Sequence, residues 1–208
     1  MTETAGISPP HLITASFLPA DEREELLRWA IANEHLFKPA LTDHGLQQVA
    51  RHALCLRDLG PWAERLQARA LGELPHWINQ LRVTPFVPSV VELELVAHNH
   101  GAHFTIHSDT YSSSQPARGD RMLSAIYYFH DPSPQFSGGD LRLHRVGAAT
   151  HANALDINPC SDRLVVFPSW WPHEVMRVSC ASGAFEHSRF SLNCWVHRAR
   201  PDGPEALP

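Results

Sequence analysis

The chain has 208 residues with a formal net charge of −5, and 43% of its residues are hydrophobic and 19% charged. This length is expected for one domain with decorations rather than two, and the composition is that of an ordinary globular protein. Because no run of lysine and arginine stands out, a phosphate-backbone footprint is excluded and we expect no nucleic-acid partner.

Targeting signals are not visible in the sequence. Residues 1–10 are polar and small, without the basic and apolar regions of a secretory signal, and no apolar run reaches membrane-spanning length. The cysteines are scattered without a CxxC pair, as expected for reduced thiols: Cys55, Cys160, Cys180 and Cys194. We therefore expect a cytoplasmic protein that does not bind a membrane.

Helical patterns occupy the N-terminal part, over about residues 11–85. A helix is predicted to open at Ala20, because acidic residues fill its first turn, where the helix dipole favours negative charge. A second helical run covers roughly 61–81 and is predicted to break or kink near Pro75. The first ten residues and the tail over 200–208 are predicted to be frayed or disordered.

From Val87 onward the hydrophobic period changes to two, which is typical of β-strands. The strand candidates begin with the alternating segment 91–97 and continue over 102–109, 122–130, 140–145, 152–157, 163–167, 173–178 and 188–197. About eight short strands after helices predict a mostly β protein. We expect one domain over 1–208, with a double-stranded β-helix (jelly roll) over about 88–198 and the helices packed on one outer face. A β-sandwich without a site would give the same pattern.

Two histidines and an aspartate form a candidate metal site. His107 and Asp109 are two residues apart, so on a strand they point to the same face at a spacing of about 6.6 Å. His173 follows the hydrophobic strand 164–167 and would reach the same metal from another strand. Two imidazoles and a carboxylate suit mononuclear iron(II) and leave three coordination positions open. An HxD triplet alone is common by chance and is more often a surface pair.

A candidate anion clamp follows on the last predicted strand. Arg189 and Ser191 share a strand face, where a guanidinium and a hydroxyl can bind a small dicarboxylate. Tyr128, on another strand, could donate its phenol proton to the same carboxylate. The alternatives are a solvated surface arginine and a tyrosine packed as an ordinary core aromatic.

At this point the chain resembles a known family. The motifs occur in the order His-x-Asp, Ile-Tyr-Tyr-Phe, Ser-Gly-Gly-Asp-Leu-Arg-Leu, Asp-Arg-Leu-Val-Val-Phe-Pro, His-Glu-Val and Arg-x-Ser. This order is similar to the prolyl-4-hydroxylase-like branch of the iron(II)/2-oxoglutarate dioxygenases, over about residues 92–197. The combination is much more specific than any one motif.

The resemblance implies a role for each matched residue. His107, Asp109 and His173 would be the iron ligands, and Arg189, Ser191 and Tyr128 would hold the distal carboxylate of 2-oxoglutarate. Further positions would line the co-substrate pocket, namely Ile126 and Leu141, with Trp195 near its closed end.

The implied activity is hydroxylation of an unactivated C–H bond, with release of succinate and carbon dioxide. Iron(II), 2-oxoglutarate and O2 would be required, with ascorbate as a candidate reductant. The substrate would be a small molecule, an amino acid or a peptidyl residue such as proline. Asp109 stands where a halogenating enzyme needs a small residue, so halogenation is disfavoured.

Two features depart from the family pattern. The interval from His173 to Arg189 is 16 residues, which is longer than usual, and we expect the extra residues around 179–185 to form a hairpin loop. Trp195 stands where the nucleic-acid demethylating branch has a second arginine.

The segment over 110–120 follows the metal candidates and is either a lid over the substrate or a plain surface connection. Arg118 and Arg121 would meet an acidic group or be solvated surface charges. Trp170 and Trp171 would supply a substrate wall or an aromatic packed beside a turn.

Two other classes of protein remain open on the sequence. One is a non-catalytic jelly roll that binds a metal or an anion, such as a cupin-like sensor module. The other is a zinc-dependent hydrolase with the same three ligands, for which Glu174 is the adjacent carboxylate that could act as general base.

Overall fold

The computed structural model describes residues 7–41, 50–110, 119–147 and 154–199. Its helices are α1 (Ala20–Ala32) and α2 (Ala63–Leu81), with the 3-10 turns η1 (Glu34–Leu36), η2 (Gly60–Trp62) and η4 (Phe185–His187). Of the disorder expected over residues 1–10 and 200–208, residues 1–6 and 200–208 lie outside the described residues, as does most of the candidate lid including Arg118, whereas Ile7 forms a β-bridge with Val146.

The described strands form two main sheets and one small one. Their bounds are β1 (Leu12–Ala15), β2 (Lys38–Pro39), β3 (Arg51–His52), β4 (Leu54–Leu56), β5 (Pro88–His98), β6 (His103–His107), β7 (Asp120–Tyr128), β8 (Ser137–Gly138), β9 (Leu141–Leu143), β10 (Leu155–Ile157), β11 (Arg163–Pro168), β12 (His173–Val175), β13 (Val178–Ser179) and β14 (Arg189–Arg198).

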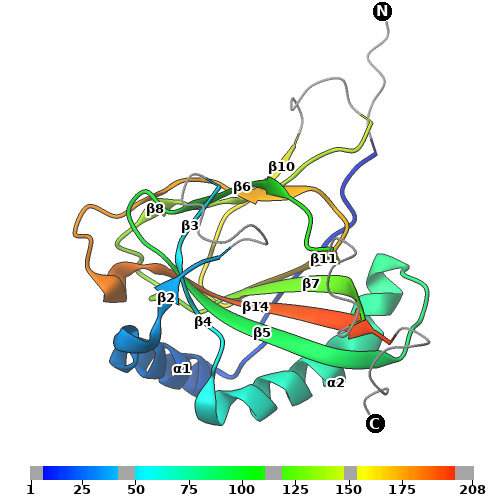
Figure 1. Ribbon diagram of the computed structural model, residues 1–208, viewed down its shortest axis with the longest axis horizontal. Helices are drawn as coiled ribbons and strands as arrows, with labels where there is room; N and C mark the ends of the chain where they lie inside the picture. Colours follow the sequence, from blue (N-terminus) through cyan, green and yellow to red (C-terminus); the bar gives the residue numbers. More distant parts are fainter. Residues whose placement is uncertain (1–6, 42–49, 111–118, 148–153, 200–208) are drawn as a thin grey trace, which may run out of the picture.

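A seven-stranded antiparallel sheet, with strand order β1-β11-β7-β14-β5-β4-β2, forms the larger layer. A five-stranded antiparallel sheet, with order β10-β9-β12-β6-β3, faces it, and both helices lie beneath the larger sheet (Figure 1). This is the predicted jelly roll with helices on one outer face, and the fold class is confirmed.

The alternation along the central strands explains this layering. Residues 91, 93, 95 and 97 of β5 and residues 190, 192 and 194 of β14 pack with both helices in the main hydrophobic core. The intervening positions of the same strands face the other sheet, and several of them line a cavity. Burying one apolar face in this way is worth about 1.5–3 kcal/mol for each large side chain.

Helix α2 continues through Pro75, so the predicted break does not occur. Pro75 lies on the exposed side of the helix, where its missing N–H leaves one carbonyl open to water. The opposite side carries a buried apolar stripe that holds the helix on the sheet: Leu66, Ala70, Leu74, Trp77 and Leu81. Burial of this stripe outweighs the cost of about 3 kcal/mol for an interior proline.

Four short strands lie in the stretch whose sequence pattern is helical. β1 pairs with β11, β4 with β5, and β2 with β4, so all three extend the larger sheet. β3 pairs with β6 in the smaller sheet. Strands of two to four residues are too short to show a period, and this is why the pattern did not reveal them.

Candidate active site

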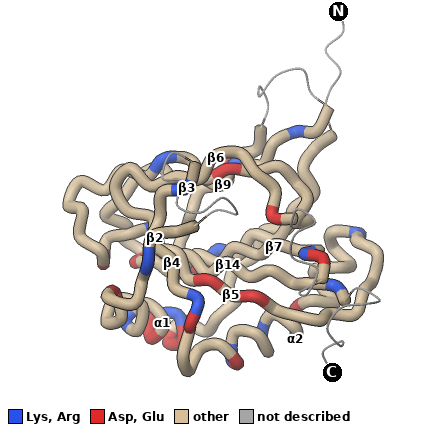
Figure 2. Tube along the Cα trace, viewed as in Figure 1, with Lys and Arg blue, Asp and Glu red and all other residues tan. Residues whose placement is uncertain are grey.

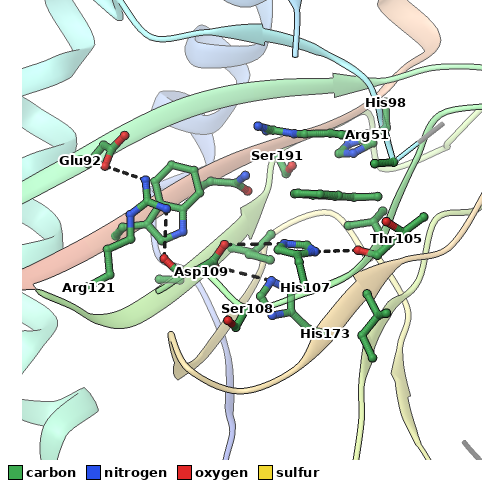
Figure 3. A pocket seen from close by; sticks show the side chains of 18 of the residues that line it. Arg51, Glu92, His98, Thr105, His107, Ser108, Asp109, Arg121, His173 and Ser191 are labelled. Atoms are coloured by element: carbon green, nitrogen blue, oxygen red, sulfur yellow. Dashed lines mark hydrogen bonds and ion pairs between the residues drawn. The ribbon is translucent and has the colours of Figure 1, made fainter. Parts of the chain in front are cut away.

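The candidate metal ligands meet at the mouth of the space between the two sheets. One ligand atom each from His107, Asp109 and His173 lies within 4.8 Å of the other two. The carboxylate of Asp109 is 3.6 Å from Nε2 of His107 and 3.5 Å from Nε2 of His173 (Figure 3). β6 ends at His107 and pairs with β12, so that His107 and His173 are direct cross-strand partners.

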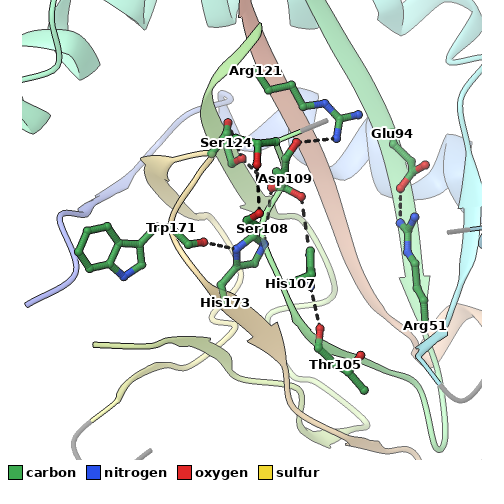
Figure 4. A network of polar contacts seen from close by, with 12 residues as sticks. Arg51, Glu94, Thr105, His107, Ser108, Asp109, Arg121, Ser124, Trp171 and His173 are labelled. Carbon is green, nitrogen blue, oxygen red and sulfur yellow. Dashed lines mark hydrogen bonds and ion pairs between the residues drawn. The ribbon is translucent and has the colours of Figure 1, made fainter. Parts of the chain in front are cut away.

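Both imidazoles are oriented by main-chain carbonyls. Nδ1 of His107 lies 2.8 Å from the carbonyl oxygen of Thr105, and Nδ1 of His173 lies 2.8 Å from that of Trp171 (Figure 4). A carbonyl only accepts, so each Nδ1 carries a proton, and each Nε2 faces Asp109. This arrangement leaves Nε2 as the nitrogen through which either ring would bind a metal.

Asp109 is fixed by a separate set of groups. The hydroxyl of Ser124 donates to Oδ2 at 2.6 Å, and the Asp109 amide donates to the carbonyl of Ser169 at 2.8 Å. Arg121 donates from Nη1 to the Asp109 carbonyl at 3.2 Å and from Nη2 to Glu92 at 2.8 Å. The carboxylate therefore keeps its position without depending on the imidazoles.

The protonation states of the cluster suit a divalent cation. Burial, reinforced by the proximity of His173, lowers the pKa of His107 to about 3, although Asp109 opposes this shift. Burial raises the pKa of Asp109, but the two histidines and the Ser124 hydrogen bond outweigh burial and hold that pKa below its ordinary value. At neutral pH the cluster thus has a carboxylate and a neutral His107, which are the forms that bind metal.

Arg189 lies fully buried elsewhere in the same cavity, whose volume is about 720 Å³. Its Nη2 donates to the Tyr128 hydroxyl at 3.2 Å, its Nη1 lies 3.2 Å from Nδ1 of His98, and its guanidinium lies 4.7 Å from the Tyr128 ring centre. Within the described part of the chain, Arg189 forms no ion pair with a carboxylate. There, neither the Nε atom of Arg189 nor the Nε2 atom of His98 has a hydrogen-bond partner. A buried guanidinium in this state suits an anionic ligand.

The Ser-Gly-Gly motif makes room for this arginine. Gly139 has φ +75°, and a Cβ at this position would lie 2.6 Å from Cδ of Arg189. Only glycine combines this left-handed backbone with so close an approach. Ser191 is buried and lines the cavity two residues beyond Arg189 on the same face of β14, as the alternation predicts.

The other predicted pocket residues lie at different depths. Ile126 lines the cavity, whereas Tyr128 and Leu141 are fully buried in the hydrophobic cluster behind it. Trp195 lies six residues beyond Arg189 on β14, roughly 20 Å along an extended strand, and lines the same cavity. Its ring packs 4.2 Å from the Arg121 guanidinium, so Trp195 lines the part of the cavity away from Arg189.

The remaining aromatic and charged candidates also have defined places. Trp171 is buried and donates its indole N–H to the His144 carbonyl at 2.6 Å, whereas Trp170 is 45% exposed. Glu174 is adjacent to His173 but pairs with His144 at 3.1 Å and with Arg142 at 3.7 Å. It is not among the cavity-lining residues of the described chain, so it is badly placed to act as the base of a hydrolase.

Sequence reasoning missed several residues of the site. Ser124 shares a strand face with Ile126 and Tyr128, and this alternation could have indicated it. His98 could have been found in the same way, because it follows Glu92, Glu94 and Val96 on one face of β5. Arg51 and Phe104 gave no signal, because their positions depend on a two-residue strand and on an irregular strand pairing.

Comparison with known proteins identifies the class. The family model of the 2OG-Fe(II) oxygenase superfamily matches residues 93–197 of this chain, which is about half of its length. The chain belongs to this superfamily, whose members use Fe(II) and 2-oxoglutarate. The resemblance inferred from the motifs is therefore confirmed.

Individual relatives agree with this assignment. An uncharacterized PKHD-type hydroxylase from Synechocystis sp. is 31% identical over 189 residues, which cover 88% of this chain. The chain spans 61% of the length of that curated relative.

Solved structures share the fold. A Pseudomonas putida prolyl-4-hydroxylase matches with a TM-score of 0.69 and 24% identity, over 92% of this chain and 94% of that one. A Trichoplax adhaerens prolyl hydroxylase, solved with a hypoxia-inducible-factor peptide fragment, matches with a TM-score of 0.63 and 19% identity, over 91% and 84% of the two chains. At these identities the likeness shows the fold alone.

Proposed function

We propose that this chain is a hydroxylase that binds iron(II) through His107, Asp109 and His173 and holds 2-oxoglutarate with Arg189. The observation that carries the proposal is that a metal-ligand cluster and a buried guanidinium line the same cavity. Two imidazole Nε2 atoms and a carboxylate converge with the donor set and spacing that suit a divalent metal, and a buried guanidinium in the same cavity has no carboxylate partner among the described residues.

Each residue of the proposed site has a task that follows from its contacts. The main-chain carbonyls of Thr105 and Trp171 hold the protons on Nδ1 of the two histidines, so that both Nε2 atoms stay available. Arg189, supported by Tyr128, would bind the distal carboxylate of the co-substrate, and Ser191 would add a hydroxyl donor. Bound iron(II) and 2-oxoglutarate would supply the oxidising chemistry, with release of succinate and carbon dioxide.

The substrate class is part of the proposal. We propose oxidation of an unactivated C–H bond in a small molecule, an amino acid or a peptidyl residue, with prolyl peptides the first to test. The prolyl hydroxylases among the structural neighbours support this order of testing. In Figure 2 basic and acidic positions are interspersed over both sheets, a distribution that favours a substrate other than nucleic acid.

The proposed compartment is the cytoplasm. Cys55, Cys160, Cys180 and Cys194 are all free thiols, which favours a reducing environment. No helix in the described ranges combines the length and the apolar character that a membrane crossing needs.

Anaerobic addition of iron(II) and 2-oxoglutarate tests the proposal directly. We expect a weak visible charge-transfer band from the wild-type chain and none from His173→Ala. On admission of oxygen in the presence of ascorbate, succinate release across amino acids, proline-containing peptides and small molecules then identifies the substrate. Arg189→Gln should raise the 2-oxoglutarate concentration for half-saturation at least about 10-fold, because charge-assisted hydrogen bonds are worth about 1.5–3 kcal/mol.

Glu174→Gln is the matched control, since this residue adjoins His173 but points to His144. It should keep the band and the succinate release. A colourless protein that prefers zinc and loses a hydrolytic activity with Glu174→Gln would favour the hydrolase instead. A metal-binding protein that never releases succinate would favour the cupin-like module.

A further inference from the structure

The pairing of β6 with β12 is irregular next to the metal site. His173 pairs with His107 and Val175 pairs with Phe104, so two steps on β12 correspond to three on β6. The extra residue on β6 is a β-bulge, which turns side chains that would otherwise point to opposite faces. Phe104 and His107, three residues apart, therefore lie on the same face of the strand and line the same cavity.

The two rings are stacked. The centroids of Phe104 and His107 are 3.5 Å apart and their planes differ by 18°, so that the phenyl ring covers one face of the imidazole. On its other side Phe104 carries the guanidinium of Arg51, whose central carbon is 5.0 Å from the phenyl centroid. The three groups form a column in which the phenyl ring of Phe104 lies between the Arg51 guanidinium and the His107 imidazole. Figure 3 labels the two ends of this column, Arg51 and His107.

The far end of the column is anchored in the larger sheet. Arg51 lies on β3 of the smaller sheet and forms an ion pair with the buried carboxylate of Glu94 on β5 (Figure 4). Arg57 donates from Nε to the other oxygen of Glu94 at 2.9 Å. Arg51 also donates to the Leu41 carbonyl at 3.3 Å and is only 8% exposed, so the guanidinium has little freedom to move.

We propose that Arg51 and Phe104 are positioning residues for the metal ligand His107, so that the N-terminal strand β3 is a working part of the iron site. The inference rests on the proposed function, in which His107 binds the metal. The Thr105 carbonyl fixes one ring atom of His107 but still permits the ring to swing about that hydrogen bond. The stacked phenyl ring restricts this swing, because rotation would separate the ring faces or drive them together.

A comparison of metal affinities tests the inference without use of enzyme activity. The full-length apo protein is titrated with Co(II), followed by its ligand-field absorption, for wild type, Phe104→Leu, Phe104→Tyr and Arg51→Met. Phe104→Leu removes the flat ring and should weaken Co(II) binding about 10-fold, the usual scale for losing a partner that orients a metal ligand. Phe104→Tyr keeps the ring and should remain within threefold of wild type.

Arg51→Met keeps much of the side-chain length but removes the cation and its tie to Glu94. We expect a loss of affinity smaller than that of Phe104→Leu, with a shifted absorption band. Ile106→Ala is the control on the same strand, since Ile106 is 48% exposed and makes no ring contact with His107. It should bind Co(II) as wild type does.

Two outcomes separate failure of this inference from failure of the proposed function. If His173→Ala loses Co(II) binding while Phe104→Leu stays within threefold of wild type, the positioning role is wrong and the metal site stands. If His173→Ala binds Co(II) normally, the metal site itself is wrong. Should Phe104→Leu fail to fold by circular dichroism, Arg51→Met decides: an unchanged affinity and spectrum would overturn the role of the column.

Discussion

His98 is a buried histidine whose protonation is opposed by its surroundings. It is fully enclosed, and burial first and the Arg189 guanidinium second hold its pKa well below the ordinary value. Its Nδ1 accepts from Arg189, so the proton of the neutral ring lies on Nε2. Protonation would place two cations in contact inside the protein, which the fold resists.

A stability change with pH follows from this shift. In the unfolded chain His98 titrates near pH 6.5, whereas in the folded chain it stays neutral to much lower pH. Below pH 6.5 the unfolded state therefore binds more protons, and the free energy of unfolding falls by up to about 1.4 kcal/mol for each pH unit from this residue alone. Well above pH 6.5 the ring is neutral in both states, and the residue has no such effect.

Urea unfolding of the apo protein at pH 7.5, 6.5 and 5.5, with a chelator present, measures this contribution. His98→Gln should show a smaller loss of unfolding free energy between pH 6.5 and 5.5 than wild type. His35→Gln, at an exposed position, serves as control. Equal slopes for wild type and His98→Gln would contradict the assignment.

The metal candidates could be predicted because their geometry is local. A two-residue spacing places His107 and Asp109 on one side of any extended segment, and alternation places Ser191 beside Arg189. Phe104 is an exception to this alternation. The bulge in β6 places its ring on the same face as His107, whereas in a regular strand two residues three apart point to opposite faces. Contacts between strands, such as that of Arg51 on β3 with the ring of Phe104 on β6, need the register that only the folded sheet defines.

At the scale of elements, length decided what the sequence could predict. β5 and β14 have 11 and 10 residues and show clear alternation, whereas β2 and β3 have two residues each and depend on their partners. The helices were predictable from their apolar stripes and the acidic first turn of α1. Pro75 was misleading, because a single-sequence rule cannot weigh one lost hydrogen bond against a whole buried stripe.

Helix α2 offers a clean test of local propensity. Gly72 lies on the exposed side of the helix, and no atom lies within 4 Å of the position that a Cβ would occupy. Gly72→Ala should raise the free energy of unfolding by about 0.5–1 kcal/mol, because alanine loses less backbone entropy in a helix. Chemical denaturation measures the change, and a destabilised variant would show that this helix turn is not free to accept a side chain.

At the scale of the whole molecule, stability should be highest in the centre of the larger sheet. β5, β14 and β7 each have a neighbour on both sides, and their inner residues pack against the helices. β2 and β10 are edge strands of the two main sheets. Backbone amides paired on both sides open only with the global unfolding of the core, whereas edges fray.

Amide hydrogen exchange followed by mass spectrometry measures this difference. We expect the slowest exchange in peptides that cover residues 91–97, 123–128 and 190–196, and the fastest among the strands in those that cover β2 and β10. Equally slow exchange at the edges would show that something other than the described sheet protects them.

The position of β14 in the larger sheet has a consequence for folding during synthesis. It is the last described strand along the chain, yet it lies between β5 and β7 and carries Arg189 and Ser191. During synthesis on the ribosome, β5 and β7 therefore leave the ribosome before β14, and the larger sheet cannot be completed until β14 pairs with both of them. A chain interrupted before residue 189 would therefore lack the strand that joins β5 to β7, together with the guanidinium proposed to bind the co-substrate.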